Sequence, residues 1–204
     1  KEDLPQFLYL LEDCRRDGCI LNYQERQNSL SSGIMIDIDR YQKSQLREIT
    51  ERQLLSFAQV VARIMNNVID FTPADGNDGE DFKFNVFFIQ KPQPLLDKES
   101  KYAKSAALEN ETYTGPVYKD GFHMLIPEIM INRGAKRYII DEIIKRKVMD
   151  NVFKGIDFTV QPAHEMIDRA SSYVNVCFFG NTKGPLVAYK LTLIAEISLS
   201  VDML

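Results

Sequence analysis

The chain has 204 residues, of which 45% are hydrophobic and 26% are charged, and its formal net charge at pH 7 is -4. This length and composition allow one sizeable core or two small lobes, which excludes a largely disordered protein. No run of eighteen apolar residues occurs, so we expect neither a membrane span nor a signal peptide.

The chain contains three cysteines, Cys14, Cys19 and Cys177, and no Cys-x-x-Cys pair. An odd number of cysteines without metal-ligand spacing indicates reduced thiols and argues against a zinc knuckle. We therefore expect an intracellular protein.

Hydrophobic periodicity predicts the elements of the first half. An amphipathic helix is expected from about 4 to 17, followed by strands over 19–25 and 33–39. Ser44 can cap a long helix that ends near Ile69. Seven apolar residues form the predicted buried stripe of this helix: Leu46, Ile49, Leu54, Phe57, Val61, Ile64 and Val68.

The second half begins with a strand over 81–90 and a long connection over 91–120, a length typical of functional loops. A strand over 121–127 and a helix over 135–153 follow. Two more strands are expected over 174–180 and 188–199. Because helices interleave with hydrophobic strands, we predict an α+β or α/β fold with mixed sheets packed against helices in a single domain, 1–204.

The segment SSGIMIDIDRYQ places Asp37 and Asp39 inside an otherwise apolar run. Side chains alternate across a strand, so the two carboxylates share one face, about 7 Å apart, and the isoleucines of the run face a core. Neighbouring carboxylates repel unless a cation compensates, and hard oxygen ligands suit Mg²⁺ or Mn²⁺. The alternative is a strand end whose aspartates meet water or pair with Arg40 or with an amine on a helix.

Three later residues carry groups that could complete such a site, and each has a simpler explanation. His123 lies on a predicted strand and is either a satisfied core residue or a ligand for a phosphate oxygen. Asp168 supplies a third carboxylate or caps a helix. Lys183, in a glycine-bounded turn, seeks phosphate or is a solvated turn residue.

Basic residues gather in two tracts despite the negative net charge. The charge pattern fits either a solvated helix surface or a local basic face that holds nucleic acid. The first tract is Lys98, Lys101 and Lys104; the second is Arg133, Lys136, Arg137, Lys145, Arg146 and Lys147.

Taken together, an Asp-x-Asp strand, a strand histidine, a hydrophobic-Asp pair and a Gly-x-Thr-Lys hairpin resemble the archaeo-eukaryotic primase superfamily. The stretches LEDCRRDGCILNYQERQNSLSSGIMIDIDRY, GFHMLIP and CFFGNTKGPLVAYKL are similar to the primase domain of the primase-helicases of large DNA viruses of eukaryotes. The resemblance spans about 11–191, although residues 70–120 match no recognisable part of it.

The resemblance implies an archaeo-eukaryotic primase-type catalytic core in which an RRM-like sheet carries the active site. It implies that Asp37, Asp39 and Asp168 bind two catalytic metal ions. It also assigns His123 and the hairpin residues Thr182 and Lys183 to the phosphates of the incoming nucleotide.

The sequence departs from the family pattern at two positions. Relatives usually carry serine two residues before the motif histidine, where this chain has Gly121, and some carry arginine six residues before the hairpin lysine, where it has Cys177. Lys119, Arg133 or Arg26 could replace the missing contacts.

We therefore expect a DNA primase, a nucleotidyltransferase that uses Mg²⁺ or Mn²⁺ to join nucleoside triphosphates on single-stranded DNA during replication. The chain would be part of a longer primase-helicase with its helicase beyond Leu204, acting at the replication site of the virus in the host cell. The alternatives are a non-catalytic single-strand-binding domain that stacks bases on aromatic residues and a metal-dependent nuclease.

Overall fold

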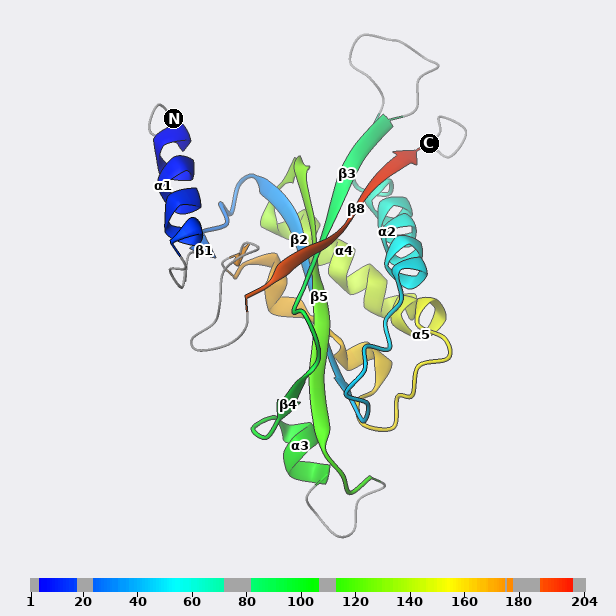
Figure 1. The fold of residues 1–204 in the computed structure, drawn as a ribbon. Helices are drawn as coiled ribbons and strands as arrows, with labels where there is room; N and C mark the ends of the chain where they lie inside the picture. Colours follow the sequence, from blue (N-terminus) through cyan, green and yellow to red (C-terminus); the bar gives the residue numbers. More distant parts are fainter. Residues whose placement is uncertain are drawn as a thin grey trace.

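The structure is a computed structural model that describes residues 4–17, 24–71, 82–106, 113–174, 176–177 and 188–199. Its main layer is a six-stranded sheet with strand order β6-β2-β5-β3-β8, to which β4 is added by pairing with β5 (Figure 1). A small second sheet consists of β1 and β7. The strands are β1 Gln24–Glu25, β2 Ser32–Gln42, β3 Phe82–Gln90, β4 Leu95–Asp97, β5 Val117–Ile131, β6 Ile167–Asp168, β7 Val176–Cys177 and β8 Lys190–Leu199.

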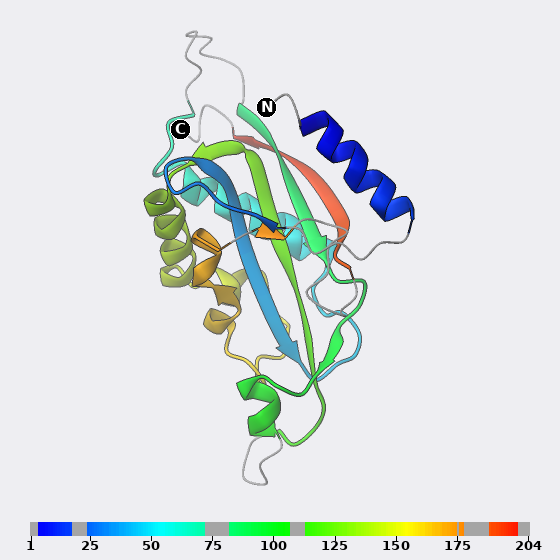
Figure 2. The ribbon, with the colours of Figure 1, turned by 90° about the vertical axis from the view of Figure 1, so that its left-hand side faces the viewer.

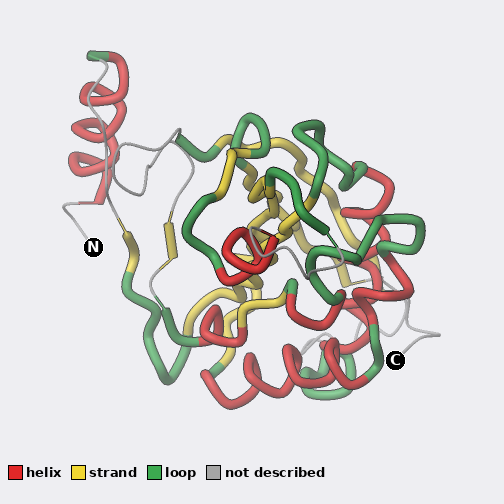
Figure 3. The backbone as a smooth tube through the Cα atoms, turned by 90° about the horizontal axis from the view of Figure 1, so that it is seen from below, coloured by secondary structure: helices red, strands yellow, loops and turns green. Residues whose placement is uncertain are grey.

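Helices cover one face of this sheet and leave much of the other face open. Figure 2 views the open face, with α2 and α4 behind the strands. Helix α1 projects away from these layers (Figures 1 and 3). The α-helices are α1 Leu4–Arg16, α2 Glu51–Met65, α3 Lys101–Ala106, α4 Arg133–Lys145 and α5 Val148–Val152, and the 3-10 helices are η1 Ala163–Glu165 and η2 Arg169–Ser172.

The expected α+β class is confirmed, and all the strand pairs described are antiparallel. None of the helices in the described ranges is long and apolar enough to cross a membrane.

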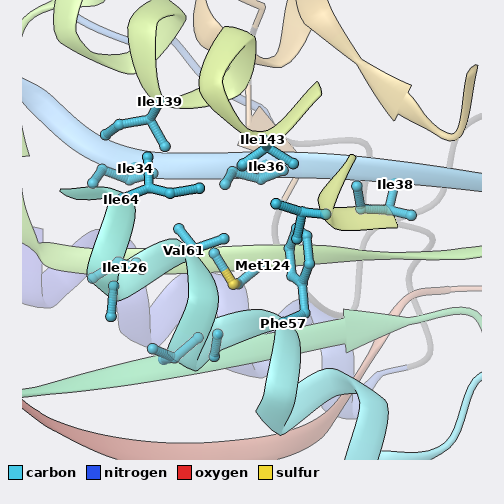
Figure 4. Packing of buried hydrophobic residues seen from close by; sticks show 14 of the residues in the cluster. Ile34, Ile36, Ile38, Phe57, Val61, Ile64, Met124, Ile126, Ile139 and Ile143 are labelled. Atoms are coloured by element: carbon cyan, nitrogen blue, oxygen red, sulfur yellow. The ribbon is translucent and has the colours of Figure 1, made fainter. Parts of the chain in front are cut away.

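The core lies between β2, β5 and the helices α2 and α4. Ile34, Ile36 and Ile38 of β2 are almost fully buried and face Phe57 and Val61 of α2 (Figure 4). Because strand side chains alternate, burying these isoleucines turns the intervening aspartates to the open face of the sheet. The core therefore fixes which face carries the candidate site.

Helix α2 begins six residues later than the sequence predicts. Thr50, rather than Ser44, is its N-cap, and Thr50 and Gln53 form a reciprocal capping box. Ser44 instead accepts a hydrogen bond from the backbone N–H of Leu46 in a turn. Leu46 was predicted to be buried, but it is 78% exposed because it precedes the helix.

The helix predicted over 135–153 is two helices in the structure. Lys147 adopts a left-handed backbone conformation with φ 51°, which ends α4 and lets α5 start in a new direction. No glycine or proline marks this break in the sequence, so the hydrophobic periodicity predicted one continuous helix.

The connection predicted over 91–120 is partly ordered. It contains β4, α3 and the first residues of β5, and β4 pairs with β5 from Leu95 to Asp97. The strand predicted over 121–127 is correspondingly longer at both ends.

Candidate active site

Asp37 lies at the centre of three adjacent strands. Its Cα position pairs with His123 of β5 on one side and with Asp168 of β6 on the other. Residues paired in this way point to the same face of a sheet. Two carboxylates and an imidazole from three distant parts of the chain therefore converge on the open face.

Asp39 follows two residues later on the same face and is held by a lysine. Lys119 of β5 donates a hydrogen bond of 2.8 Å to the Asp39 carboxylate, and its ammonium group also lies 5.4 Å from the ring centre of Tyr41. Burial opposes the charge of Lys119, but the carboxylate of Asp39 raises its pKa above the usual value. The chain thus supplies its own cation to Asp39.

Asp168 is both a strand residue and a helix cap. Its Oδ1 accepts a hydrogen bond of 2.8 Å from the backbone N–H of Ala170, which makes it the N-cap of η2. Capping had been the simpler explanation for this residue. The register with Asp37 shows that it also lies on the candidate site's edge of the sheet.

His123 is 5% exposed and lies beside Asp37, with Nε2 3.5 Å from Oδ1 of the carboxylate. Tyr189, just before β8, stacks on the imidazole with a centroid distance of 4.7 Å. Lys91 lies 5.8 Å from the centre of the tyrosine ring. Only about 10 Å³ of space remains at the site between these side chains and Lys119.

Gly121 explains one departure from the family pattern. Its backbone has φ +133°, and a Cβ atom there would lie 2.0 Å from the carbonyl oxygen of Ile38. A serine at this position would collide with β2. The hydroxyl that relatives supply two residues before the histidine cannot be supplied here without moving the strands.

Thr182 and Lys183 lie outside the described residues. The two strands that flank them, β7 and β8, belong to different sheets: β7 pairs with β1, and β8 pairs with β3. The hairpin in which the sequence placed Lys183 is therefore not formed by a pairing of β7 with β8 in the part that the structure describes.

The side chains of the three aspartates are not gathered into a metal cage. Within the described ranges, no group of three or more His, Cys, Asp or Glu side chains is arranged to hold one metal ion. Asp39 is engaged by Lys119, and one oxygen of Asp168 is engaged by its cap. The donor set, three carboxylates on adjacent strands, nevertheless has the chemistry that Mg²⁺ and Mn²⁺ require.

Sequence reasoning did not find Tyr189 or Lys91. Tyr189 had been included in a predicted strand, near the end of the stretch CFFGNTKGPLVAYKL, and Lys91 in a connection, and neither had been given a role at the site. Their proximity to His123 arises from sheet order, because Ile89 of β3 pairs with His123 and Gln90 pairs with Lys190. Only the pairing of β3 with both neighbours could have revealed it.

A comparison with protein families matches residues 1–195 to the N-terminal archaeo-eukaryotic primase (AEP) domain of the C962R protein, a viral primase-helicase. The chain belongs to this family. No curated protein matches the sequence. The resemblance seen in the motifs is thus confirmed, and the fold is that of an archaeo-eukaryotic primase-type core.

Proposed function

We propose that this archaeo-eukaryotic primase domain is a template-directed DNA primase. It would join nucleoside triphosphates into a primer on single-stranded DNA, releasing pyrophosphate at each step. Family membership supports a nucleotidyltransferase, and the arrangement of the site supports the specific residues.

The observation that carries the proposal is the register of Asp37 with both His123 and Asp168. A shift of one residue in the register of β2 with β5 or with β6 would turn one of these side chains into the core, because successive side chains of a strand point to opposite faces. Here all three share the open face, and Asp39 extends the acidic edge toward Lys119.

Asp37, Asp39 and Asp168 would hold Mg²⁺ or Mn²⁺. Such ions lower the pKa of an attacking hydroxyl and neutralise charge on the transferred and departing phosphates. A metal ion bound to Oδ2 of Asp39 would displace Lys119, and a triphosphate is the natural new partner for the released ammonium group. Lys119 thereby replaces the missing serine contact.

His123 would donate a hydrogen bond to the triphosphate, and its position beside Asp37 is fixed by the sheet. Tyr189 covers the imidazole in the present arrangement, and the remaining space is too small for a nucleotide. Binding therefore requires Tyr189 to swing away from His123. Thr182 and Lys183 would add further phosphate contacts.

In the cell, this domain would act beside a helicase domain of the same longer protein, at the replication site of a virus in its host. The domain itself would be one catalytic unit over 1–204. These assignments rest on family membership.

To test the proposal, the purified chain is given a single-stranded template, Mn²⁺ or Mg²⁺, and labelled NTPs or dNTPs. We expect primers from the parent and at least a hundredfold less from Asp37→Asn and from Asp39→Asn, because each loses a charged metal ligand.

Asp141→Asn is the matched control, since Asp141 lies on α4 and its ion pairs are long, 3.8 Å. It should synthesise at the parental rate. Equal yields from Asp37→Asn and the parent would contradict the proposal, and degradation of the template without nucleotides would indicate a nuclease instead.

A further inference from the structure

Two cavities share the segment 26–28 as a common wall, and together they are called the sheet groove. One cavity of about 380 Å³ has an apolar floor, and a second of about 480 Å³ lies beside it; both are lined by Arg26, Gln27 and Asn28. The floor is formed mainly by Met35, Phe87, Ile89, Leu125, Met130 and Leu191. Ser29, Arg133 and Tyr173 complete the second cavity.

The sheet groove starts directly beside the candidate active site. Ile89 in its floor pairs with His123, and Met35 precedes Asp37 by two residues on the same face. From Asp37 the groove follows β2 back to Ser32, about 17 Å along the strand. The candidate site and the floor of the first cavity therefore lie on the same face of the sheet, the face turned toward the viewer in Figure 2.

A buried lysine fixes the wall that the two cavities share. Lys136 is 2% exposed and donates to Oε1 of Gln27 at 2.6 Å and to the hydroxyl of Ser32 at 2.5 Å. Gln27 in turn donates to the carbonyl oxygens of Ser171, at 3.0 Å, and Val174, at 2.6 Å. This network holds the segment 26–32 against α4 and η2, so the groove is preformed.

The charge of the sheet groove opposes that of the whole chain. The chain carries a net charge of -4, yet the described residues that line the two cavities include Arg26 and Arg133 and no Asp or Glu. The guanidinium of Arg133 lies 5.7 Å from the ring centre of Tyr173, which is 52% exposed. Two arginines can contact phosphates, and an exposed aromatic ring and an apolar floor can contact the flat faces of bases, so the sheet groove suits a single-stranded nucleic acid.

Much of the second basic tract has other partners. Lys136 is buried in the wall of the groove, and Lys145 and Arg146 are paired with Glu142 at 3.0 and 2.8 Å. Of this tract, Arg133 lines one of the two cavities of the groove.

We propose that the sheet groove holds the single-stranded template next to the site of synthesis, with phosphates at Arg26 and Arg133 and bases against Tyr173 and the apolar floor. This inference rests on the proposed function for the identity of the strand. It names a binding surface separate from the carboxylates and from the triphosphate contacts. Lys119 lines the candidate site and Arg26 and Arg133 do not, so of the three residues that the sequence offered as replacement contacts only Lys119 is given that role.

The test is binding of a fluorescent oligo-dT to the full chain, in chelator and without nucleotide, over a series of salt concentrations. For Arg26→Gln/Arg133→Gln we expect weaker binding and a slope of log K against log salt that is smaller by about 1.4, because two phosphate contacts are lost. Tyr173→Ala should weaken binding about tenfold and leave the slope unchanged, since stacking does not release counterions.

Arg137→Gln is the matched control, because Arg137 lies on the same helix, is 73% exposed and lines neither cavity. It should keep the parental slope, and its affinity should fall by no more than the loss of one weak contact would cause. Parental affinity and slope in the double variant would overturn the groove. Equal affinity of the parent for a duplex would also overturn it, because paired bases cannot reach Tyr173.

Failure of the groove can be told from failure of the proposed function. Asp37→Asn should bind oligo-dT in chelator as the parent does, and Arg26→Gln/Arg133→Gln should bind Mn²⁺ with a nucleoside triphosphate as the parent does. Primer synthesis by Asp37→Asn would refute the proposed function and leave the groove assignment standing. Parental oligo-dT binding by the double arginine variant would refute the groove assignment and leave the proposed function standing.

Discussion

Lys119 controls whether the carboxylate of Asp39 is available to a metal ion. It neutralises Asp39 over 2.8 Å, and its raised pKa keeps it charged at any physiological pH. An ammonium ion beside a carboxylate competes with any other cation for that oxygen. Metal affinity and nucleotide affinity should therefore be linked through this side chain.

Replacing Lys119 with methionine should tighten Mn²⁺ binding in the absence of nucleotide. Methionine keeps the apolar length of the side chain and removes the competing charge, and we expect a gain of about tenfold, or about 1.4 kcal/mol. Titration of Mn²⁺ followed by electron paramagnetic resonance measures it directly. Nucleoside triphosphate affinity should fall in the same variant, because a phosphate partner is lost.

The control for this change is Lys83→Met on β3. Lys83 is 58% exposed and its ion pair with Glu196 is 4.0 Å long, so its loss should leave Mn²⁺ affinity at the parental value. Unchanged or weaker Mn²⁺ binding in Lys119→Met would show that Asp39 is not a metal ligand.

Strand β5 contains two residues that are unusual within a strand, Pro127 and Gly121, and each is explained by how β5 packs against β2. Pro127 lacks a backbone N–H, and the β2–β5 register shifts between Ser32 and Ile34, next to it. Gly33 permits this approach, because a Cβ atom there would lie 3.0 Å from Pro127. The sequence therefore predicted an end of the strand at Pro127, where the structure has an irregularity.

Gly121 should not tolerate the serine that relatives carry. We expect Gly121→Ser to lower the free energy of unfolding by more than about 2 kcal/mol, since both the positive φ and the contact with Ile38 penalise a side chain. Urea unfolding followed by circular dichroism measures the change. The variant should not gain primer synthesis from its new hydroxyl.

Gly155→Ser separates the two causes of this loss. Gly155 also has a positive φ, +96°, but nothing lies within 4 Å of the position of its Cβ. This variant should lose only the conformational part, about 1 kcal/mol. Equal losses at the two positions would mean that the contact with Ile38 contributes nothing.

Elements with strong periodicity were predictable, and elements defined by their partners were not. The alternating apolar residues of β2 and the apolar stripe of α2 form the buried faces of these elements, and both patterns can be recognised in the sequence. The break at Lys147 and the strand β4 depend on tertiary contacts that override local preference. The same division holds at the site, where Asp37 and Asp39 follow from alternation, while the proximity of Tyr189 to His123 needs the order of β3 and β8.

At the scale of the whole molecule, the sheet is tied to the loop that follows α5 by two basic residues near the end of β2. Arg40 is fully buried; it donates to Glu48 at 2.9 Å and to the backbone oxygen of Asp157, and it lies 5.3 Å from the ring centre of Phe158. Lys43 forms an ion pair of 2.9 Å with the carboxylate of Asp157. The contacts with Asp157 and Phe158 join residues more than a hundred positions apart, so they stabilise only the assembled fold.

The Lys43–Asp157 pair predicts a specific response to acid. The hydrogen bond from Lys43, aided by one from Thr159, lowers the pKa of Asp157 from 3.8 to about 2. A carboxyl group with a lowered pKa stabilises the folded state above its unfolded pKa, and this contribution is lost as the pH falls through its folded pKa. The contribution should therefore be complete above about pH 5 and should disappear between about pH 4 and 2.

Asp157→Asn isolates this contribution, because asparagine can still accept the bond from the backbone of Thr159 while losing the ion pair. We expect the parent to be more stable than the variant at pH 6, by less than about 1 kcal/mol since the carboxylate is 45% exposed and screened by solvent. Urea unfolding of both proteins from pH 6 to pH 2 should show the two free energies converging below pH 4. A difference that stays constant over this range would show that the ion pair does not contribute to folding.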